Sequence, residues 1–339
     1  MIPLIGPASA ALARYDGTLA AVPNAALLLS PLMTQEAVLS SRIEGTQATM
    51  GEVLEFEAGV KPKTADPDRT ADIQEVVNYR KSMWHAVDLL EKLPLCQRLV
   101  REAHEVLMEG VRGENKTPGS PIEQAKYIPI SVGEMPAAMA EWEKFIHEPA
   151  KDKLVQLAIL HAEFEAIHPF LDGNGRLGRM FVPLFLYQEK LIQSPMFYIS
   201  AYLEAHRDEY YNGLLEISRS DDWTGWCCFF LKAMTAQAQE NHQKATRTLN
   251  LYEAEKNRFV ELTHSQHAIK ALDFIFTRPV FQASDFTSQS GIPKSTAIRI
   301  LATLRSEGLF SILSEKQGRK PAVLAFRELL NIAEGREVF

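Results

Sequence analysis

The most informative stretch of the chain, residues 168–179, reads HPFLDGNGRLGR. Two glycines flank Asn174 directly after Asp172, which predicts a tight turn, and the residues that follow predict the start of a new helix. The free N–H groups at a helix start attract anions, and Arg176 and Arg179 lie about one turn apart on this helix. The stretch therefore predicts a phosphate-binding turn.

The segment before this stretch predicts a buried helix. Leu157, Leu160, Phe164 and Ile167 recur three and four positions apart, so they form one apolar face that leads into His168. Helical spacing also covers most of the chain on both sides, and almost no segment before residue 263 alternates like a strand. Further helices are expected over residues 1–57 with a break near 21–24, and over 73–93, 95–111, 135–147, 173–189, 205–218 and 223–262. We therefore expect an all-α body.

The last 76 residues follow another pattern. Three short helices are expected over 266–276, 284–290 and 293–307, followed by a hairpin of 309–313 with 322–326. This order is typical of a winged helix-turn-helix domain, which is a small α+β fold. We expect the domains to be an N-terminal helical region (1–70), a catalytic core (71–245), a helical linker (246–263) and the winged helix (264–339).

Composition and charge restrict the class of protein. The chain has 339 residues, 46% of them hydrophobic and 23% charged, which excludes a disordered protein and predicts more than one domain. The three cysteines have no zinc-ligand spacing, which favours a reducing compartment. Because no signal peptide and no long apolar run is present, we expect a cytoplasmic protein that does not bind membranes.

The C-terminal module carries a charge opposite to that of the rest. The net charge is -7, yet residues 264–339 hold ten Lys or Arg against seven Asp or Glu. This surplus permits contact with DNA and equally permits dimerisation or contact with a protein. The candidate DNA-contacting residues are Lys294, Ser295, Thr296 and Arg299 on the third helix, with Lys316, Arg319 and Lys320 on the wing.

Two side chains beside the phosphate-binding turn suit transfer chemistry. Asp172 is the nearest hard oxygen ligand for the Mg²⁺ that accompanies a polyphosphate. His168 lies beside the turn and could take a proton from a hydroxyl near neutral pH. Together these groups predict phosphoryl or nucleotidyl transfer, in which the protein supplies positioning and charge.

The same stretch resembles the Fic family signature, HxFx(D/E)GNGRxxR. Every specified position is filled, by His168, Phe170, Asp172, Gly173, Asn174, Gly175, Arg176 and Arg179. The resemblance covers about residues 1–245 and implies an all-α Fic fold. It also implies a protein adenylyltransferase, which moves AMP from ATP to a Ser, Thr or Tyr hydroxyl of a target protein, this chain included. The family variant that phosphorylates its target has a lysine-containing turn, which is absent here.

The resemblance also implies a role for each site residue. His168 would be the base, Asp172 the Mg²⁺ ligand and Arg179 the group that holds the γ-phosphate. The rest of the ATP site would be Gly173, Asn174, Gly175, Arg176, Leu177 and Gly178, with Tyr210 and Tyr211 lining the adenine site. From the residues alone, core packing is an equally good interpretation of the two tyrosines.

A second motif lies upstream, where residues 40–46 read SSRIEGT. Ser40 and Glu44 are four residues apart and so share one helix face, and Gly45 is placed to end that helix. By itself this pattern describes a surface helix. Beside a Fic core it resembles an inhibitory helix, in which Glu44 would bind Arg179 and block productive ATP binding.

One segment departs from the family pattern, and two other functions stay open. Residues 118–130 read PGSPIEQAKYIPI, which contains no arginine, whereas the resemblance implies an aromatic residue followed by an arginine in a hairpin flap that aligns the target. The first alternative is a nucleotide-sensing transcription regulator that binds DNA. The second is an enzyme of the same fold that removes AMP, with Glu44 orienting the attacking water. In each case we expect a homo-oligomer.

Overall fold

The computed structural model describes residues 1–22, 24–60, 67–111, 130–131, 133–314 and 321–337. The expected flap, apart from Ile130, and the wing residues Lys316, Arg319 and Lys320 lie outside the described residues. The chain forms two compact units. Unit 1 comprises Met1–Gly17, Glu36–Gln47 and Gln74–Asn241, and unit 2 comprises Thr18–Gln35, Ala48–Ile73 and His242–Phe339.

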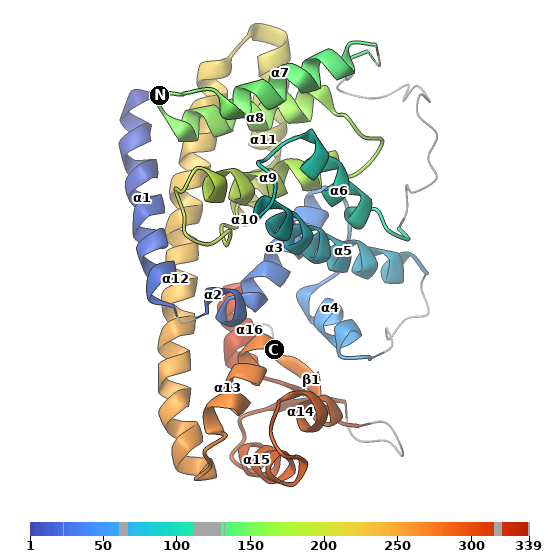
Figure 1. Cartoon of the computed structure of the whole chain (residues 1–339), viewed down its shortest axis with the longest axis vertical. Helices are drawn as coiled ribbons and strands as arrows, with labels where there is room; N and C mark the ends of the chain where they lie inside the picture. The colour runs from blue at the N-terminus through green and yellow to red at the C-terminus, as the bar shows by residue number, and fades with distance from the viewer. Residues whose placement is uncertain (23, 61–66, 112–129, 132, 315–320, 338–339) are drawn as a thin grey trace. The chain divides into compact units, whose positions relative to one another are not determined.

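Helices make up nearly all of unit 1 and much of unit 2, as Figure 1 shows. Those up to residue 263 are α1 (Ile2–Ala21), α2 (Ala25–Leu28), α3 (Ser30–Ile43), α4 (Met50–Glu57), α5 (Pro67–Leu90), α6 (Gln97–Leu107), α7 (Met135–His147), α8 (Lys153–Ile167), α9 (Asn174–Gln188), α10 (Ser200–Ala205), α11 (Arg207–Ser220) and α12 (Trp223–Thr263). The all-α body that the sequence predicts is confirmed.

Unit 1 is built around α8, whose apolar side chains are buried. Helix α7 lies along α8 (Figure 1), and its Trp142 donates an indole N–H to the carbonyl of Leu160 at 2.9 Å. Trp226 of α12 donates in the same way to the carbonyl of Ala158 at 2.7 Å. Buried indoles that find a carbonyl keep both apolar contact and a satisfied donor, so they hold the two helices in place on α8.

The connection from α8 to α9 positions the site. His168 ends α8 in the left-handed region with φ 51°, and Gly173 takes φ 82° directly before α9. A side chain at Gly173 would strain this backbone, which explains the glycine. The Asn174 side chain accepts from the N–H of Phe170 at 2.9 Å and donates to the same residue's carbonyl at 2.6 Å. The turn is therefore cross-linked, and the start of α9 is fixed beside His168.

Unit 2 contains a small α+β region, in agreement with the fold class expected from the sequence. Its elements are α13 (Ala268–Thr277), β1 (Val280–Gln282), α14 (Ala283–Gln289), α15 (Lys294–Ser306), β2 (Ser311–Ser314), β3 (Val323–Ala325) and α16 (Arg327–Glu334). The three strands form an antiparallel sheet in the order β1-β3-β2. Phe281 of β1 pairs with Leu324 of β3, and both belong to an apolar core with Phe286 and Ile300.

Strands β2 and β3 are the antiparallel pair that the sequence predicts, whereas β1 and α16 were not predicted. Strand β1 has only three residues, too few for the alternation by which a strand is recognised. The expected domain boundaries stay predictions. Across the described part of the chain, no helix has both the length and the apolar character needed to span a membrane.

Candidate active site

Two arginines on the first turns of α9 are buried. Arg176 is 2% exposed, with Nη1 3.1 Å from Glu75 and Nη2 3.3 Å from Asp172. Arg179 is fully buried, and its Nε and Nη2 each donate to Ser40 of α3 at 2.9 Å, to the hydroxyl and the carbonyl respectively. Both guanidinium groups are thus fixed near a helix start that already favours negative charge.

Glu44 meets Arg179 at this helix start. Its carboxylate lies 2.6 Å from Nη2 of Arg179. A Cβ atom at Gly175 would collide with the same carboxylate, so Glu44 lies directly against the first turn of α9. Within the described residues, Nη1 of Arg179 is buried and makes no hydrogen bond. The carboxylate of Glu44 therefore occupies the position at the start of α9 where an anionic ligand would bind.

Glu44 is not on the helix itself, which corrects one expectation. Helix α3 ends at Ile43, and Glu44 lies in the turn that follows. Gly45 has φ 106°, and the N–H of Thr46 reaches back to the carbonyl of Ser41 at 3.2 Å. Because glycine adopts this conformation without strain, the chain turns there and brings Glu44 over α9.

The charges around Arg179 are strongly coupled. Burial disfavours the charged form of Arg179 and so lowers its pKa. The carboxylates of Glu44 and Glu165 and the hydroxyl of Tyr210 outweigh this effect, so that the pKa of Arg179 is raised. Arg179 therefore remains charged. A buried cation whose acidic partner is removed is costly, so Arg179 needs either Glu44 or another anion.

His168 has the protonation state of a base. Partial burial lowers its pKa, and a hydrogen bond from the imidazole to the backbone carbonyl of Glu165 offsets only part of this. The ring is therefore mainly neutral near pH 7. With one ring nitrogen donating to Glu165, the other nitrogen is the one that can accept a proton.

Asp172 provides a single carboxylate at the mouth of the turn. Its Oδ1 accepts from the N–H of Gly173 at 2.7 Å and lies beside Arg176. Its carbonyl lies 3.0 Å from Nε2 of His104, whose ring stacks on Phe170 with the centroids 3.8 Å apart. Within the described residues, no three acidic, His or Cys side chains form a metal site. One carboxylate suits Mg²⁺ that is held mainly by phosphates.

The two tyrosines of α11 take different positions. Tyr211 is 41% exposed and lines a cavity of about 980 Å³, whereas Tyr210 is buried. The Tyr210 hydroxyl lies 2.9 Å from Nε2 of His161 and 3.4 Å from Glu165. Burial lowers the pKa of His161 to about 3 and raises that of Glu165 to about 7. Of the pair, Tyr211 is therefore the one that can touch a ligand.

Two acids near the arginines, Glu75 and Glu36, were not predicted from the sequence. Glu75 of α5 pairs with Arg176 across 101 residues of sequence. Glu36 of α3 is 3% exposed and accepts the hydroxyl of Ser200 at 2.6 Å and its N–H at 3.0 Å. Spacing offered a partial signal for Glu36, because it precedes Ser40 by four residues on the same helix face.

Together, the turn, the buried arginines and the adjacent histidine place groups suited to an anion beside a neutral imidazole in a helical protein. The sequence matches the family models described as Fic/DOC family N-terminal over residues 2–88 and Fic/DOC family over residues 94–186, together more than half of the chain. The chain therefore belongs to the Fic/DOC family.

Solved structures share the fold. A Fic family protein from Desulfovibrio desulfuricans G20 is 20% identical, with 96% of this chain and 95% of that chain covered and a TM-score of 0.59. A Fic domain-containing signaling protein from Bacteroides thetaiotaomicron is 19% identical over 72% of this chain and 98% of its own, with a TM-score of 0.57. Fic-1 from C. elegans is 18% identical over 71% of each chain, with a TM-score of 0.55.

Proposed function

We propose that the protein transfers AMP from ATP to a hydroxyl side chain of a target protein, and that Glu44 restrains this activity. The observation that carries the proposal is the convergence of Glu44, Arg179 and Gly175 at the start of α9, beside His168. Membership of a family of nucleotide-binding transferases supports the chemistry.

The residues have complementary tasks in this reaction. The target hydroxyl oxygen attacks the α-phosphorus of ATP, the bond from that phosphorus to the β-bridging oxygen breaks, and pyrophosphate leaves. His168 takes the hydroxyl proton on the ring nitrogen that does not face Glu165. Arg176 and the N–H groups of α9 bind the phosphates. Asp172 would hold Mg²⁺, which supplies positive charge to the phosphate oxygens.

The restraint follows from competition for one guanidinium. Arg179 is the group that would hold the γ-phosphate, and Glu44 pairs with it at 2.6 Å. A carboxylate and a phosphate use the same donors, so they exclude each other. Removing Glu44 leaves Arg179 as a buried cation without its acidic partner, so binding of the γ-phosphate to Arg179 becomes more favourable.

Labelled ATP tests both parts of the proposal. Only nucleotidyl transfer leaves the α-label on protein, whereas a kinase leaves the γ-label. We expect the α-label alone to appear on protein. Glu44→Gly should label itself or a lysate protein about tenfold or more above the parent, because a tenfold change corresponds to about 1.4 kcal/mol of lost competition. Adding Arg179→Ala to Glu44→Gly should erase the gain.

The sign of the Glu44 effect separates the competing activities. An enzyme that removes AMP with Glu44 as a water-orienting group would lose activity in Glu44→Gly. Unchanged or reduced α-labelling in Glu44→Gly would therefore contradict the restraint. Asp172→Ala should abolish Mg²⁺-dependent labelling, and full activity in that variant would place the metal elsewhere.

DNA binding by unit 2 is a second candidate function, and the exposed face of α15 favours it. Helices α14 and α15 are joined by a short turn in which Gly291 has φ 67°, and this connection supports a helix-turn-helix. Lys294 and Ser295 are exposed at the start of α15, and Ile298 is 53% exposed. Arg299 instead donates to the carbonyl of Thr263 at 3.0 Å.

A gel shift at low and high salt tests this function. DNA binding predicts a shifted band that weakens as salt rises, because phosphate contacts release counterions. Lys294→Ala should weaken the band, and Lys270→Ala, an exposed lysine of α13, should not. No band at either salt concentration would leave dimerisation or protein contact as the role of this face.

A further inference from the structure

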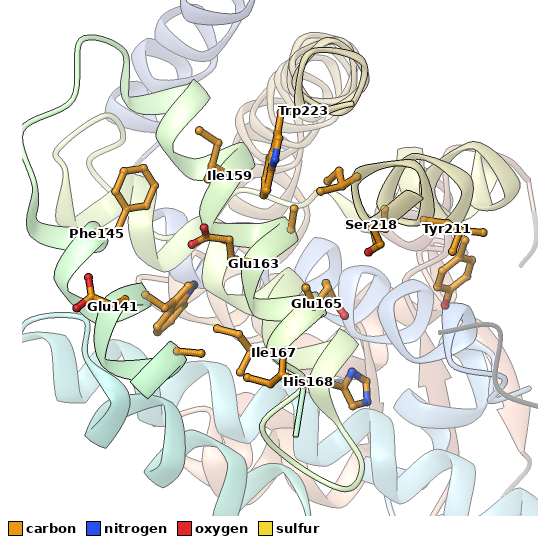
Figure 2. A pocket seen from close by; sticks show the side chains of 18 of the residues that line it. Glu141, Phe145, Ile159, Glu163, Glu165, Ile167, His168, Tyr211, Ser218 and Trp223 are labelled. Atoms are coloured by element: carbon orange, nitrogen blue, oxygen red, sulfur yellow. The ribbon is translucent and has the colours of Figure 1, made fainter. Parts of the chain in front are cut away.

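A groove of about 980 Å³ extends from His168 along α8, with α7 and α11 as its walls. Glu165 of α8 lines this groove, and Figure 2 shows it near the end that carries His168 and Tyr211. Its side chain is 12% exposed. A Cβ atom at Gly178 would collide with Oε1 of Glu165. The carboxyl group of Glu165 therefore lies against α9, one residue before Arg179.

The hydrogen bonds around Tyr210 determine where three protons lie. His161 Nδ1 lies 3.0 Å from the carbonyl of Gly178, and a carbonyl can only accept, so Nδ1 carries the proton of the neutral ring. Burial lowers the pKa of His161 to about 3, so Nε2 carries no proton and accepts from the Tyr210 hydroxyl at 2.9 Å. This bond uses the single proton of Tyr210. The Tyr210 oxygen can therefore form a hydrogen bond with Glu165, 3.4 Å away, only when Glu165 is protonated.

A protonated Glu165 completes a chain of hydrogen bonds from the groove to α9. The acid donates to Tyr210, Tyr210 donates to His161, and His161 donates to the carbonyl of Gly178. Gly178 directly precedes Arg179 in α9. If Glu165 loses its proton, the Tyr210 hydroxyl can donate to the carboxylate or to His161, but not to both. Loss of the proton therefore breaks one link of the chain.

The titratable groups that face Glu165 come from three helices and one turn of unit 1. They are His161 and His168 on α8 itself, Arg179 on α9, Tyr210 and Tyr211 on α11, and Glu44 in the turn after α3. Burial raises the pKa of Glu165 to about 7, with a contribution from the negative charge of Glu44, whereas Arg179 lowers it. Additional negative charge beside Arg179 therefore favours the protonated form of Glu165.

The γ-phosphate of ATP would bring such a charge. Under the proposed function it replaces Glu44 at Arg179, and a terminal phosphate carries about −1.5 to −2 charge at pH 7, more than one carboxylate. Nη1 of Arg179 is buried and makes no hydrogen bond within the described residues, so it is a donor for an incoming anion. An ionised Glu165 would compete with the phosphate for this cation and would repel the phosphate.

We propose that Glu165 is a positioning residue that must be protonated for ATP to bind at Arg179, so that ATP binding takes up a proton from solvent at this carboxylate. The protonated form keeps the hydrogen-bond chain to Gly178 intact and leaves the charge of Arg179 to the phosphate. The ionised form breaks the chain and attracts Arg179 itself. This inference rests on the proposed binding of ATP at Arg179 and adds a proton as a second requirement.

Titrations with a fluorescent ATP analogue test this coupling. The analogue has a methylene group between its α- and β-phosphorus atoms, so it is not cleaved, and Mg²⁺ is left out so that the phosphate charge is not shared. The protein is Glu44→Gly, in which Arg179 is open to the phosphate. Its affinity should fall about tenfold between about pH 6 and pH 8, because Glu165 ionises in the free protein. The matching ADP analogue lacks the γ-phosphate, so its affinity should change less.

Two substitutions in the Glu44→Gly protein assign the pH dependence. Glu165→Gln cannot ionise and keeps an amide donor for Tyr210, so its affinity should not fall as pH rises. Glu163→Gln should retain the fall. It is the matched control, because Glu163 is an acid on the same helix that lines the same groove and takes no part in the chain. Thermal unfolding shows whether each variant is folded. Calorimetry in two buffers with different heats of ionisation measures the proton uptake directly.

The outcomes distinguish this inference from the proposed function. A fall in affinity that persists in Glu165→Gln overturns the inference. Equal proton uptake for the ATP and ADP analogues in Glu44→Gly protein also overturns it, and this measurement needs no variant of Glu165. Proton-coupled binding without any α-label transfer supports the inference and contradicts AMP transfer. Transfer of the α-label with ATP binding that does not depend on Glu165 overturns the inference and leaves the proposed function intact.

Discussion

The start of α9 and the groove along α8 both adjoin His168, but they treat charge in opposite ways. At the start of α9 the two buried arginines are each paired with an acid, Arg176 with Glu75 and Arg179 with Glu44. In the groove the acids outnumber the bases, and Glu163 has no partner within the described residues. The arginines of α9 thus have acidic partners within the protein, whereas Glu163 has no basic partner among the described residues.

This difference indicates how the two regions meet their ligands. Under the proposed function, an anion that binds at the start of α9 competes with Glu44 for Arg179, so its binding would be coupled to movement of Glu44. Among the described residues that line the groove, Glu163 has no comparable ion pair. The start of α9 is therefore the region where competition could regulate binding.

The largest effect is expected where the two regions meet. Under the proposed function, His168→Ala removes the proton acceptor and leaves the arginines of α9 in place, so transfer should fall about 10²- to 10⁴-fold. Affinity for ATP should stay the same, as a titration would show. If the affinity fell together with the rate, His168 would be a structural residue.

The next effect breaks one internal pair. Glu75→Ala leaves the buried Arg176 without its main partner, and the free energy of unfolding should fall by about 3 kcal/mol. Urea denaturation measures this loss. Glu216→Ala, which disrupts an exposed pair with Arg219, should change stability little. If both substitutions lowered the free energy of unfolding by the same amount, burial would add nothing to the strength of the ion pair between Arg176 and Glu75.

A third effect concerns the titration of Glu165, which lies between the two regions. Burial raises its pKa from 4.5 to about 7, so between these values the folded protein holds a proton that the unfolded chain has lost. Stability should therefore decline as pH rises from about 4.5 to 7, by an amount on the order of 2 kcal/mol. Glu165→Gln should flatten this part of the profile. A decline of the same size in Glu165→Gln would assign it to another group.

Local patterns predicted much of this site because its key turn is short. The glycines and arginines of residues 168–179 specify a turn and a helix start by themselves, and the structure has both. Glu44 is close to Arg179 as the family resemblance implied, although it lies just past the end of α3. The pair of Glu44 and Arg179 spans 135 residues and was expected only from the resemblance. The features that were predicted from the residues themselves depend on side chains within a few positions of one another, where backbone geometry is decisive.

The acids that satisfy the site could not be predicted in this way. Glu75 lies 101 residues from Arg176, and Glu36 lies 164 residues from Ser200. Each stands in an amphipathic helix, where a buried acid and a solvated one give the same local pattern. Only the packing of distant helices reveals the partner. Tyr210 was ambiguous for the same reason, since its inward position depends on the place of α11 beside α8.

The smallest expected effect tests which contacts hold α3 beside Arg179 of α9. Glu36 accepts both the hydroxyl and the N–H of Ser200, so Glu36→Gln would place an amide donor against one of these donors. A double-mutant cycle with Ser200→Ala should give a coupling of about 1–2 kcal/mol. Hydrogen exchange should rise in α3, which carries Ser40, and stay unchanged in α7 beside the groove. Equal exchange in both helices would mean that Glu36 stabilises unit 1 as a whole, and that α3 is held against Arg179 by Ser40 and Glu44 alone.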